Sequence, residues 1–418
     1  MKRYAILRGK LSDGPAAATA DAVRAMVSLD QALDIVACRA APGPTERVRL
    51  EDAGGRVLAR PVIARRTAPA SDVSAMDGYA VRSDDLKSLP ALLRLAGRTF
   101  AGEPAAGALV PGTAARVFTG APLPPGADRV VLQEEVRADG AVVVVTTAGG
   151  KPHVRSRGSD FRAGDILVPT ATTLTPGCLV AAAAADLAEL EVFARPKVSI
   201  LATGDELRPP GMTGASPETI PDSVSVGVSA LARLFGAKPT VHSLLRDEPA
   251  SLRSAAKVAA ERADIVIVIG GASVGERDYA RTMFGPDLDI SFSKVRMRPA
   301  KPTWFGSAHG TLVLGLPGNP VAALVAARLF LAPLLCGLCG LSPRSALRWR
   351  KAPLATELEP TSDFDLLLCA RPREDAVEVL ANRDSSAQSA LAQTGLLVRR
   401  RPNAPSAVAG TFVETLDF

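Results

Sequence analysis

Residues 264–275 read DIVIVIGGASVG, an apolar run followed by a glycine-rich turn. Five consecutive Val and Ile residues predict a parallel strand that is covered on both faces. The run at 197–203, KVSILAT, has the same character. Helical patterns at 225–235 and 249–262 separate these apolar runs. The alternation of strand and helix predicts a doubly wound parallel α/β domain over 195–341.

The chain changes character on both sides of this domain. Short apolar runs between Gly and Pro turns predict two small β domains, at 63–149 and 342–418. The segments 28–62 and 150–194 are expected to form one discontinuous helical linker domain. Residues 1–27 are rich in alanine and predict a tail. The fold class is therefore α/β plus β, with several domains.

Composition excludes several classes of function. The chain has 49 Lys and Arg residues against 43 Asp and Glu residues, a net charge of +6. This excess is compatible with an Arg-rich background or with a preference for small anions. Aromatic residues make up only 4% of the chain and no basic block occurs, so we expect no nucleic-acid partner. The three histidines form no zinc-binding motif.

Cysteine usage and hydropathy bear on location. Five cysteines at irregular spacing predict no disulfide framework and a reducing, cytoplasmic environment. Cys336 and Cys339 have a redox-like spacing, but their apolar surroundings favour two small buried residues at a helix end. The most membrane-like stretch, 321–338, contains Arg328 and Pro333. It predicts a buried helix, so we expect no membrane partner.

Four motifs lie where predicted strands end, and open parallel sheets bind ligands at the carboxyl ends of their strands. Two acids occupy the turn 203–207, TGDEL, and the glycines of 270–275 allow backbone N–H groups to approach an anion. Two cations lie between prolines in 297–302, MRPAKP, and 315–320, GLPGNP, opens a helix whose N-terminus favours negative charge. Each motif alone is typical of an ordinary βα turn. Together they predict a site for Mg²⁺ and for an oxyanion or phosphate.

Eight motifs, in this order, resemble those of the MoeA/gephyrin-type molybdopterin molybdenumtransferases. They are 74–80 (SAMDGYA), 119–122 (TGAP), 126–128 with 133–134, 157–160 (RGSD), 203–207, 270–279, 301–302 and 315–320. The similarity extends from about residue 28 to residue 341. It implies a central molybdopterin-binding, MogA-like α/β domain with flanking small β domains and a C-terminal β-barrel-like domain.

The resemblance also implies an activity. The family inserts molybdate into adenylylated molybdopterin, with Mg²⁺-dependent release of AMP, during molybdenum cofactor biosynthesis. It implies a cytoplasmic homodimer, with an active cleft between the α/β domain of one subunit and the β domain of the other. Contact with the molybdopterin adenylyltransferase is a further expectation.

Matching positions imply roles for individual residues. The residues implied in catalysis are Asp205, Glu206, Asp278 and Lys301, and those implied in metal binding are Asp205, Glu206 and Asp222. The residues implied in binding molybdopterin, phosphate or molybdate are Asp77, Thr119, Asp160, Gly271, Ser273, Gly275, Arg298, Pro317 and Pro320. Of these, Asp77, Thr119 and Asp160 are expected to reach in from the partner subunit.

The chain departs from the family pattern at several positions. Val224 stands where the family usually has Asn, Arg298 stands for the first of two lysines, and Ala300 stands for a glycine. Arg keeps the charge of Lys but not its compact ammonium geometry. In the C-terminal domain, acids occupy 362–365 (SDFD) and 384–387 (DSSA), where basic or neutral groups are expected.

These departures leave alternatives open. A further arginine, such as Arg371 or Arg383, would restore the anion pocket on the C-terminal side. Otherwise the chain is a non-catalytic molybdopterin-binding paralogue, a carrier or a sensor. A structural scaffold is a third possibility. The retained acids, the glycine-rich turn and Lys301 favour an active transferase.

Overall fold

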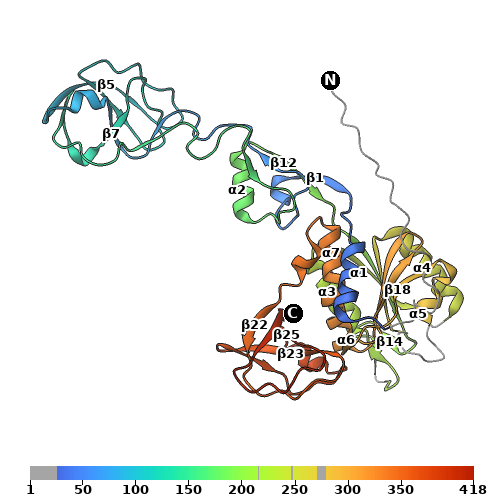
Figure 1. The fold of residues 1–418 in the computed structure, drawn as a ribbon. Coiled ribbons are helices and arrows are strands. Elements are labelled where there is room, and N and C mark those ends of the chain that lie inside the picture. Colours follow the sequence, from blue (N-terminus) through green and yellow to red (C-terminus); the bar gives the residue numbers. More distant parts are fainter. Residues whose placement is uncertain (1–25, 215, 246–247, 271–278) are drawn as a thin grey trace, which may run out of the picture. The chain divides into compact units, whose positions relative to one another are not determined.

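The computed structural model describes residues 26–214, 216–245, 248–270 and 279–418 (Figure 1). They divide into two compact units. Unit 1 comprises Met1–Thr45 and Phe193–Phe418, and unit 2 comprises Glu46–Val192.

The core of unit 1 is a six-stranded sheet in the order β16-β13-β17-β21-β20-β18. Strands β16, β13, β17 and β21 pair in parallel, and β20 and β18 add antiparallel strands at one edge. This confirms the predicted doubly wound α/β domain. The bounds are β13 Lys197–Thr203, β16 Lys238–Leu245, β17 Ile265–Ile269, β18 Asp289–Phe292, β20 Trp304–Ala308 and β21 Thr311–Leu316.

Strand β17 shows why its sequence is apolar throughout. Ile265, Ile267 and Ile269 belong to a core cluster shared with the helices of one face, whereas Val266 and Val268 belong to a second cluster shared with α4. Both faces of the strand are therefore buried. The helices of the domain are α1 Leu29–Arg39, α3 Ser223–Leu234, α4 Pro249–Arg262, α5 Tyr279–Thr282, α6 Pro320–Ala326 and α7 Ala332–Leu338.

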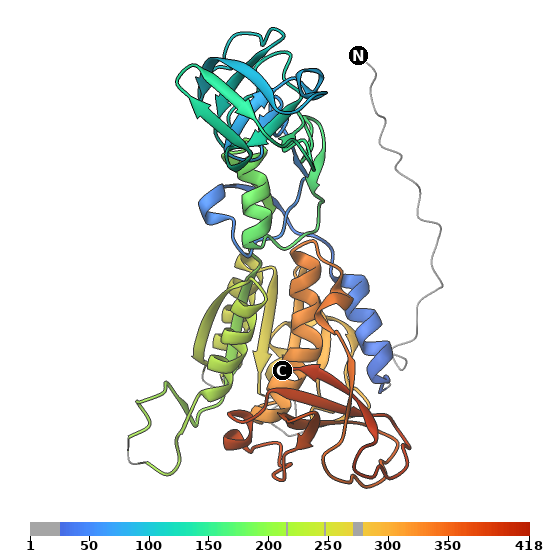
Figure 2. The ribbon, with the colours of Figure 1, turned by 90° about the vertical axis from the view of Figure 1, so that its left-hand side faces the viewer.

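The most apolar helix runs without interruption from Pro320 to Leu338, with a π-helical turn, η6 (Ala327–Leu331), between α6 and α7. Among the described residues it is the one helix long and apolar enough to cross a membrane, but 89% of its apolar window is buried inside the protein. Figure 2 shows it in orange, between α3 in green and α1 in blue. Cys336 and Cys339 are buried at its end, as expected.

Helix α1 begins with the predicted N-cap. Ser28 accepts a hydrogen bond from the backbone of Gln31, and the Gln31 side chain bonds back to the Ser28 backbone, which completes a capping box. Leu29, Ala32 and Val36 on one face of α1 are buried in the core of unit 1. The segment expected as a linker, 28–62, is therefore divided: residues 28–45, which include its first helix, belong to unit 1, and residues 46–62 belong to unit 2.

A second sheet of unit 1 contains the C-terminal strands, in the order β19-β23-β25-β26-β22, and β24 pairs with β23. Strand β19 is contributed by the predicted α/β domain, which the sequence did not indicate. The bounds are β19 Met297–Arg298, β22 Arg350–Pro353, β23 Asp365–Arg373, β24 Ala376–Val379, β25 Leu396–Arg400 and β26 Phe412–Asp417, with α8 Gln388–Leu391, η5 Gly285–Asp287 and η7 Pro343–Ala346.

Unit 2 contains a six-stranded sheet in the order β7-β4-β6-β5-β9-β8. Its bounds are β4 Gly78–Val81, β5 Ala91–Thr99, β6 Thr113–Val117, β7 Arg129–Leu132, β8 Val136–Asp139 and β9 Val142–Val145, with η3 Ser83–Leu86 and η4 Gln133–Glu135. The strands cover most of the small β region expected at 63–149.

The remainder of unit 2 joins segments from both ends of its sequence. Leu58 and Val62 share a core with Phe161, Leu174 and Val192, as a discontinuous domain requires. Thr175 caps α2 with Pro at the first helical turn, as predicted. The bounds are β1 Thr45–Arg49, η2 Leu50–Asp52, β2 Val62–Ile63, β3 Val73–Ser74, β10 Val154–Arg155, β11 Ile166–Val168, α2 Pro176–Ala184 and β12 Glu189–Phe193.

Candidate functional site

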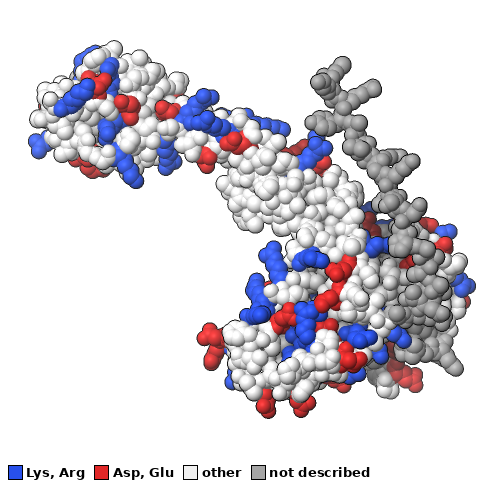
Figure 3. Space-filling view, in the orientation of Figure 1, with Lys and Arg blue, Asp and Glu red and all other residues white. Residues whose placement is uncertain are grey.

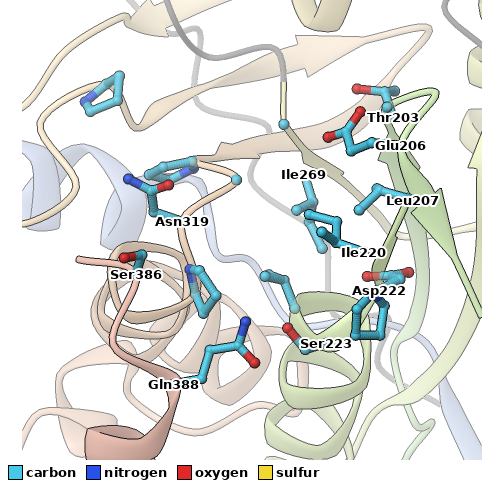
Figure 4. A pocket seen from close by; sticks show the side chains of 18 of the residues that line it. Thr203, Glu206, Leu207, Ile220, Asp222, Ser223, Ile269, Asn319, Ser386 and Gln388 are labelled. Carbon is cyan, nitrogen blue, oxygen red and sulfur yellow. The ribbon is translucent and has the colours of Figure 1, made fainter. Parts of the chain in front are cut away.

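A pocket of about 880 Å³ opens at the carboxyl ends of β13, β17 and β21, all in unit 1 (Figure 4). This is the edge of the sheet at which the four motifs were expected to meet. The α/β domain and the C-terminal region both contribute to its wall. Its lining residues are Thr203, Gly204, Glu206, Leu207, Ile220, Pro221, Asp222, Ser223, Val224, Ile269, Gly270, Lys294, Lys301, Pro302, Pro317, Gly318, Asn319, Pro320, Ser386 and Gln388.

The acidic side of the pocket is built by a short ladder. Strand β14 (Leu207–Arg208) pairs in parallel with β15 (Ile220–Pro221), so Glu206 precedes the ladder and Asp222 follows it. A span of three residues in a strand separates backbone positions by about 10 Å. The two carboxylates therefore line the same pocket from opposite ends of the ladder.

Each of these acids has a defined environment. The Glu206 carboxylate lies over Gly204, where an added Cβ would be 2.8 Å from each carboxylate oxygen. Asp222 is buried and caps α3, since its Oδ1 accepts a hydrogen bond of 3.1 Å from the backbone of Ser225. Asp205 is exposed on the turn and is absent from the lining.

Gly270 brings the end of β17 against the end of β13. Its φ is +93°, and an added Cβ would lie 2.9 Å from the carbonyl oxygen of Thr203. Both the conformation and the close approach require glycine. The other predicted residues of this turn, Gly271, Ser273, Gly275 and Asp278, lie outside the described residues.

The N-terminus of α6 forms another wall of the pocket. Pro317 is buried and Pro320 opens the helix, so both predicted prolines lie at the site. Pro320 has no N–H, so the first backbone N–H of the helix is that of Val321, and it donates to the carbonyl of Ser385 at 3.0 Å. Asn319 donates through Nδ2 to the hydroxyl of the same serine at 2.9 Å. The C-terminal turn therefore closes over the start of the helix.

Ser386 of that turn also lines the pocket. Its backbone N–H and its hydroxyl both donate to Oδ1 of Asp384, each at 2.8 Å. These two hydrogen bonds, the backbone one first, hold the pKa of the Asp384 carboxyl below its ordinary value. The acid expected at this position is therefore an ionised group whose oxygen bonds within its own turn.

The basic side of the pocket contains Lys301 and Lys294. Lys294 belongs to no motif and was not predicted from the sequence. Arg298 is exposed on β19 and is not part of the lining. Its guanidinium carbon lies 4.7 Å from the centroid of the Phe364 ring, and the ammonium nitrogen of Lys301 lies 5.5 Å from the same centroid.

The acids on either side of Phe364 do not enter the pocket lining. Asp365 is buried and accepts a 2.7 Å hydrogen bond from Nε of Arg399. Asp363 is exposed. Neither proposed substitute arginine lines the pocket: Arg371 pairs with Glu378 at 2.8 Å, and Arg383 is exposed.

The predicted residues of unit 2 form a separate polar turn. Oδ1 of Asp77 accepts hydrogen bonds from the backbone N–H of Thr119 at 2.8 Å and from its hydroxyl at 2.9 Å. The backbone bond first, and then the hydroxyl, lower the pKa of the Asp77 carboxyl from its ordinary value. Asp160 is exposed in another turn of the unit. The participation of these residues in a shared cleft stays a prediction.

A metal ion held by the protein alone requires several converging ligands. The described parts of the chain contain no group of three or more His, Cys, Asp or Glu side chains that could hold a metal ion. The predicted set of Asp205, Glu206 and Asp222 is therefore not assembled as a closed cage. Glu206 at the pocket wall is compatible with Mg²⁺, which commonly binds one or two carboxylates together with water and substrate phosphates.

Comparisons with known proteins agree with this geometry. Residues 27–185 match the family described as MoeA N-terminal region (domain I and II), and residues 199–336 match the probable molybdopterin binding domain. The chain is 34% identical over 331 residues to a molybdopterin molybdenumtransferase of Haemophilus influenzae, covering 78% of this chain and 80% of the relative. It is 38% identical over 307 residues to one of Nostoc, covering 71% and 70%.

A solved structure is similar over nearly the whole chain. It is a molybdopterin biosynthesis MoeA protein from Pyrococcus horikoshii, with 26% identity and a TM-score of 0.83. The match covers 94% of this chain and 99% of that protein.

Proposed function

Because the chain belongs to the molybdopterin molybdenumtransferase family, we propose that its unit 1 pocket inserts molybdate into adenylylated molybdopterin and releases AMP. This places the protein in molybdenum cofactor biosynthesis. One observation carries the proposal: the strand-end pocket joins an acid from the TGDEL turn, Glu206, with a cation from the MRPAKP turn, Lys301. Molybdate and the phosphates of the pterin substrate are anions, so a binding site requires the cation.

The cationic and acidic residues of the pocket have different roles. Lys301 and Lys294 attract and hold the anionic groups of the substrates. Glu206 is placed to hold a cation or to orient water beside a phosphate. Asp222 fixes the start of α3 in the pocket wall, because its oxygen caps the helix.

Mg²⁺ fits this arrangement as a partner of Glu206, its remaining ligands being water and substrate phosphate oxygens. When bound there, it would neutralise phosphate charge and make the phosphorus more electrophilic. The proposal also includes Asp205 and Asp278, and their match to the motifs of the family is the one reason for including them.

The proposal extends to assembly and location. A homodimer would allow Asp77, Thr119 and Asp160 of the partner subunit to complete the cleft, and the hydrogen bonds from Thr119 keep Asp77 anionic for that purpose. Direct transfer of the pterin intermediate from the adenylyltransferase is part of the same proposal. A cytoplasmic location belongs to the same proposal, because irregular cysteine spacing is typical of proteins in a reducing compartment.

AMP release tests the function directly. Purified protein is mixed with adenylylated molybdopterin, molybdate and Mg²⁺, and AMP is measured by chromatography. We expect Glu206→Gln to slow release by about 10²-fold, as for the loss of one electrostatic group in an active site. Glu261→Gln, on the exposed side of α4, is the matched control and should match the parent.

The same experiment separates the non-catalytic alternative. Tight binding of the pterin without AMP release in the parent protein would favour a carrier or sensor. Equal rates for the parent and Glu206→Gln would contradict the role assigned to the TGDEL turn.

A further inference from the structure

Phe364 lies where the sequence predicted the loss of anion-binding groups. The residues around it, 362–365, carry acids in place of the basic or neutral groups of the family pattern. The ring itself is buried, with 8% of its surface exposed. It is contacted on its face by two cations, Arg298 and Lys301, which come from a distant part of the sequence.

Backbone pairing brings these groups together. Strand β19 pairs in parallel with β23, so that Met297 is opposite Asp365 and Arg298 is opposite Leu366. The backbone N–H of Asp365 also donates to the carbonyl of Arg296 at 3.1 Å. The cationic turn is therefore fixed to the strand that begins immediately after Phe364.

The ring holds the cations without cancelling their charge. Both lie within about 6 Å of the ring centroid, the range in which the negative face of an aromatic ring attracts a cation. A carboxylate at the same position would neutralise one positive charge. In the described part of the chain, no carboxylate lies within ion-pair distance of Arg298 or Lys301.

The neighbouring acid is directed elsewhere. Asp365 is buried and paired with Arg399, with 2.7 Å between Oδ1 and Nε. The buried carboxylate that follows Phe364 in the sequence is therefore engaged by Arg399 and forms no ion pair with Arg298 or Lys301 among the described residues. The face of the ring also restricts a flexible lysine side chain, which reduces the conformational entropy lost when an anion binds.

We propose that Phe364 is a positioning residue that keeps Arg298 and Lys301 as an uncancelled pair of charges at the edge of the pocket and so sets its affinity for a tetrahedral oxyanion. The inference rests on the proposed function, and deepens it by assigning part of the oxyanion affinity to an aromatic side chain of the C-terminal region. Lys301 lines the pocket. Arg298, three residues earlier in the sequence, adds a second positive charge over the same ring.

Direct binding of molybdate to the full chain, measured by calorimetry, tests the inference. We expect Phe364→Leu to raise the Kd for molybdate by about 5- to 10-fold, because the aliphatic side chain fills space but has no quadrupole. Phe364→Tyr keeps the aromatic face and should stay within about twofold of the parent. Phe412→Leu, at an exposed phenylalanine of β26, is the matched control.

Two further readouts distinguish positioning from a structural role. In the AMP-release assay, Phe364→Leu should raise the KM for molybdate and leave kcat unchanged. In NMR spectra of the protein with methylated lysines, the Lys301 signal should lose its ring-current shift in Phe364→Leu and keep it in Phe364→Tyr.

The outcomes separate this inference from the function on which it rests. Equal molybdate affinity in the parent and a folded Phe364→Leu variant would overturn the role of Phe364 and leave the function standing. A parent protein that binds no molybdate would overturn the proposed function itself. Loss of affinity in Phe364→Leu with recovery in Phe364→Tyr supports the inference.

Discussion

Two groups of cations at the second sheet of unit 1 differ in whether carboxylates contact them. Arg298 and Lys301 lie over the ring of Phe364, whereas Arg399 and Arg401 lie among carboxylates. Carboxylates therefore offset the charge of Arg399 and Arg401, although Arg399 also lies over the ring of Trp349. Among the described residues, no carboxylate forms an ion pair with Arg298 or Lys301. The difference indicates that the partner of a cation, rather than the net charge of +6, determines whether that cation can bind a substrate.

The paired group joins separate elements of the unit. Arg399 contacts Asp365 at 2.7 Å and Asp30 of α1 at 2.9 Å. Arg401 contacts Asp30 at 2.8 Å and Glu414 of β26 at 2.8 Å. Figure 3 shows basic and acidic side chains interleaved over this region. The network therefore fixes α1 to the C-terminal sheet, and its charges are unavailable to a ligand.

Breaking the buried pair has the largest expected effect. Asp365→Asn leaves the buried guanidinium of Arg399 with one carboxylate, that of the exposed Asp30, and with the ring of Trp349. We expect it to lower the free energy of unfolding by about 3 kcal/mol. Both tryptophans, Trp304 and Trp349, belong to unit 1, so their fluorescence during urea unfolding reports on this unit.

The control for this variant is a more exposed ion pair of the same sheet. Glu378→Gln removes the carboxylate that Arg371 and Arg373 share, and a pair near the surface contributes less than about 1 kcal/mol. If both variants change stability equally, the buried network has no special structural role and the comparison fails.

Removing a stacked cation should affect binding instead of stability. Lys301 is exposed, so we expect Lys301→Met to change the free energy of unfolding by no more than about 0.5 kcal/mol. The loss of one charged hydrogen-bond donor should weaken molybdate binding by at least about tenfold, or 1.4 kcal/mol. Calorimetry and urea unfolding on one preparation measure both quantities.

Lys351→Met, at an exposed lysine of β22, is the matched control and should leave the molybdate Kd unchanged. A stability loss in Lys301→Met as large as that of Asp365→Asn would place Lys301 with the structural cations. Such a result would remove the distinction between the two groups.

The sequence predicted what depends on local patterns. Apolar runs predicted the strands of the α/β domain, and Ser28 and Thr175 were identified as helix caps because capping depends on a few adjacent residues. Glu206 and the two prolines of 315–320 were placed correctly at one edge of the sheet, because the parallel strands before them end at the same side. Lys301 lies at the same edge because it precedes β20, which runs antiparallel to them.

What the sequence could not predict depends on long-range pairing. Phe364 is 63 residues from Lys301, and only the pairing of β19 with β23 brings them together. Lys294 has no motif around it. The acid Asp365 was interpreted as weakening the anion pocket, but its partner Arg399 is on a different strand and no local signal indicates the pair.

The smallest expected effect concerns Ala300, which lies between the two stacked cations and replaces the glycine of the family pattern. Its φ is +75°, a conformation that costs a non-glycine residue about 1–2 kcal/mol. Glycine would remove this strain, but would lose about 0.5–1 kcal/mol through its greater freedom in the unfolded chain. It would also lose about 0.8 kcal/mol from a methyl group that is buried in the core of unit 1.

These contributions nearly cancel, so we expect Ala300→Gly to change the free energy of unfolding by less than about 0.5 kcal/mol, measured by urea unfolding. Ala300→Val, which adds a β-branched side chain at positive φ, should be clearly destabilising. A gain above about 1 kcal/mol in Ala300→Gly would mean that strain at the turn exceeds the value of the buried methyl. A change near zero would explain how the chain carries alanine at this position without a loss of stability. Burial of the Ala300 methyl group in the core would then offset the backbone strain between Arg298 and Lys301.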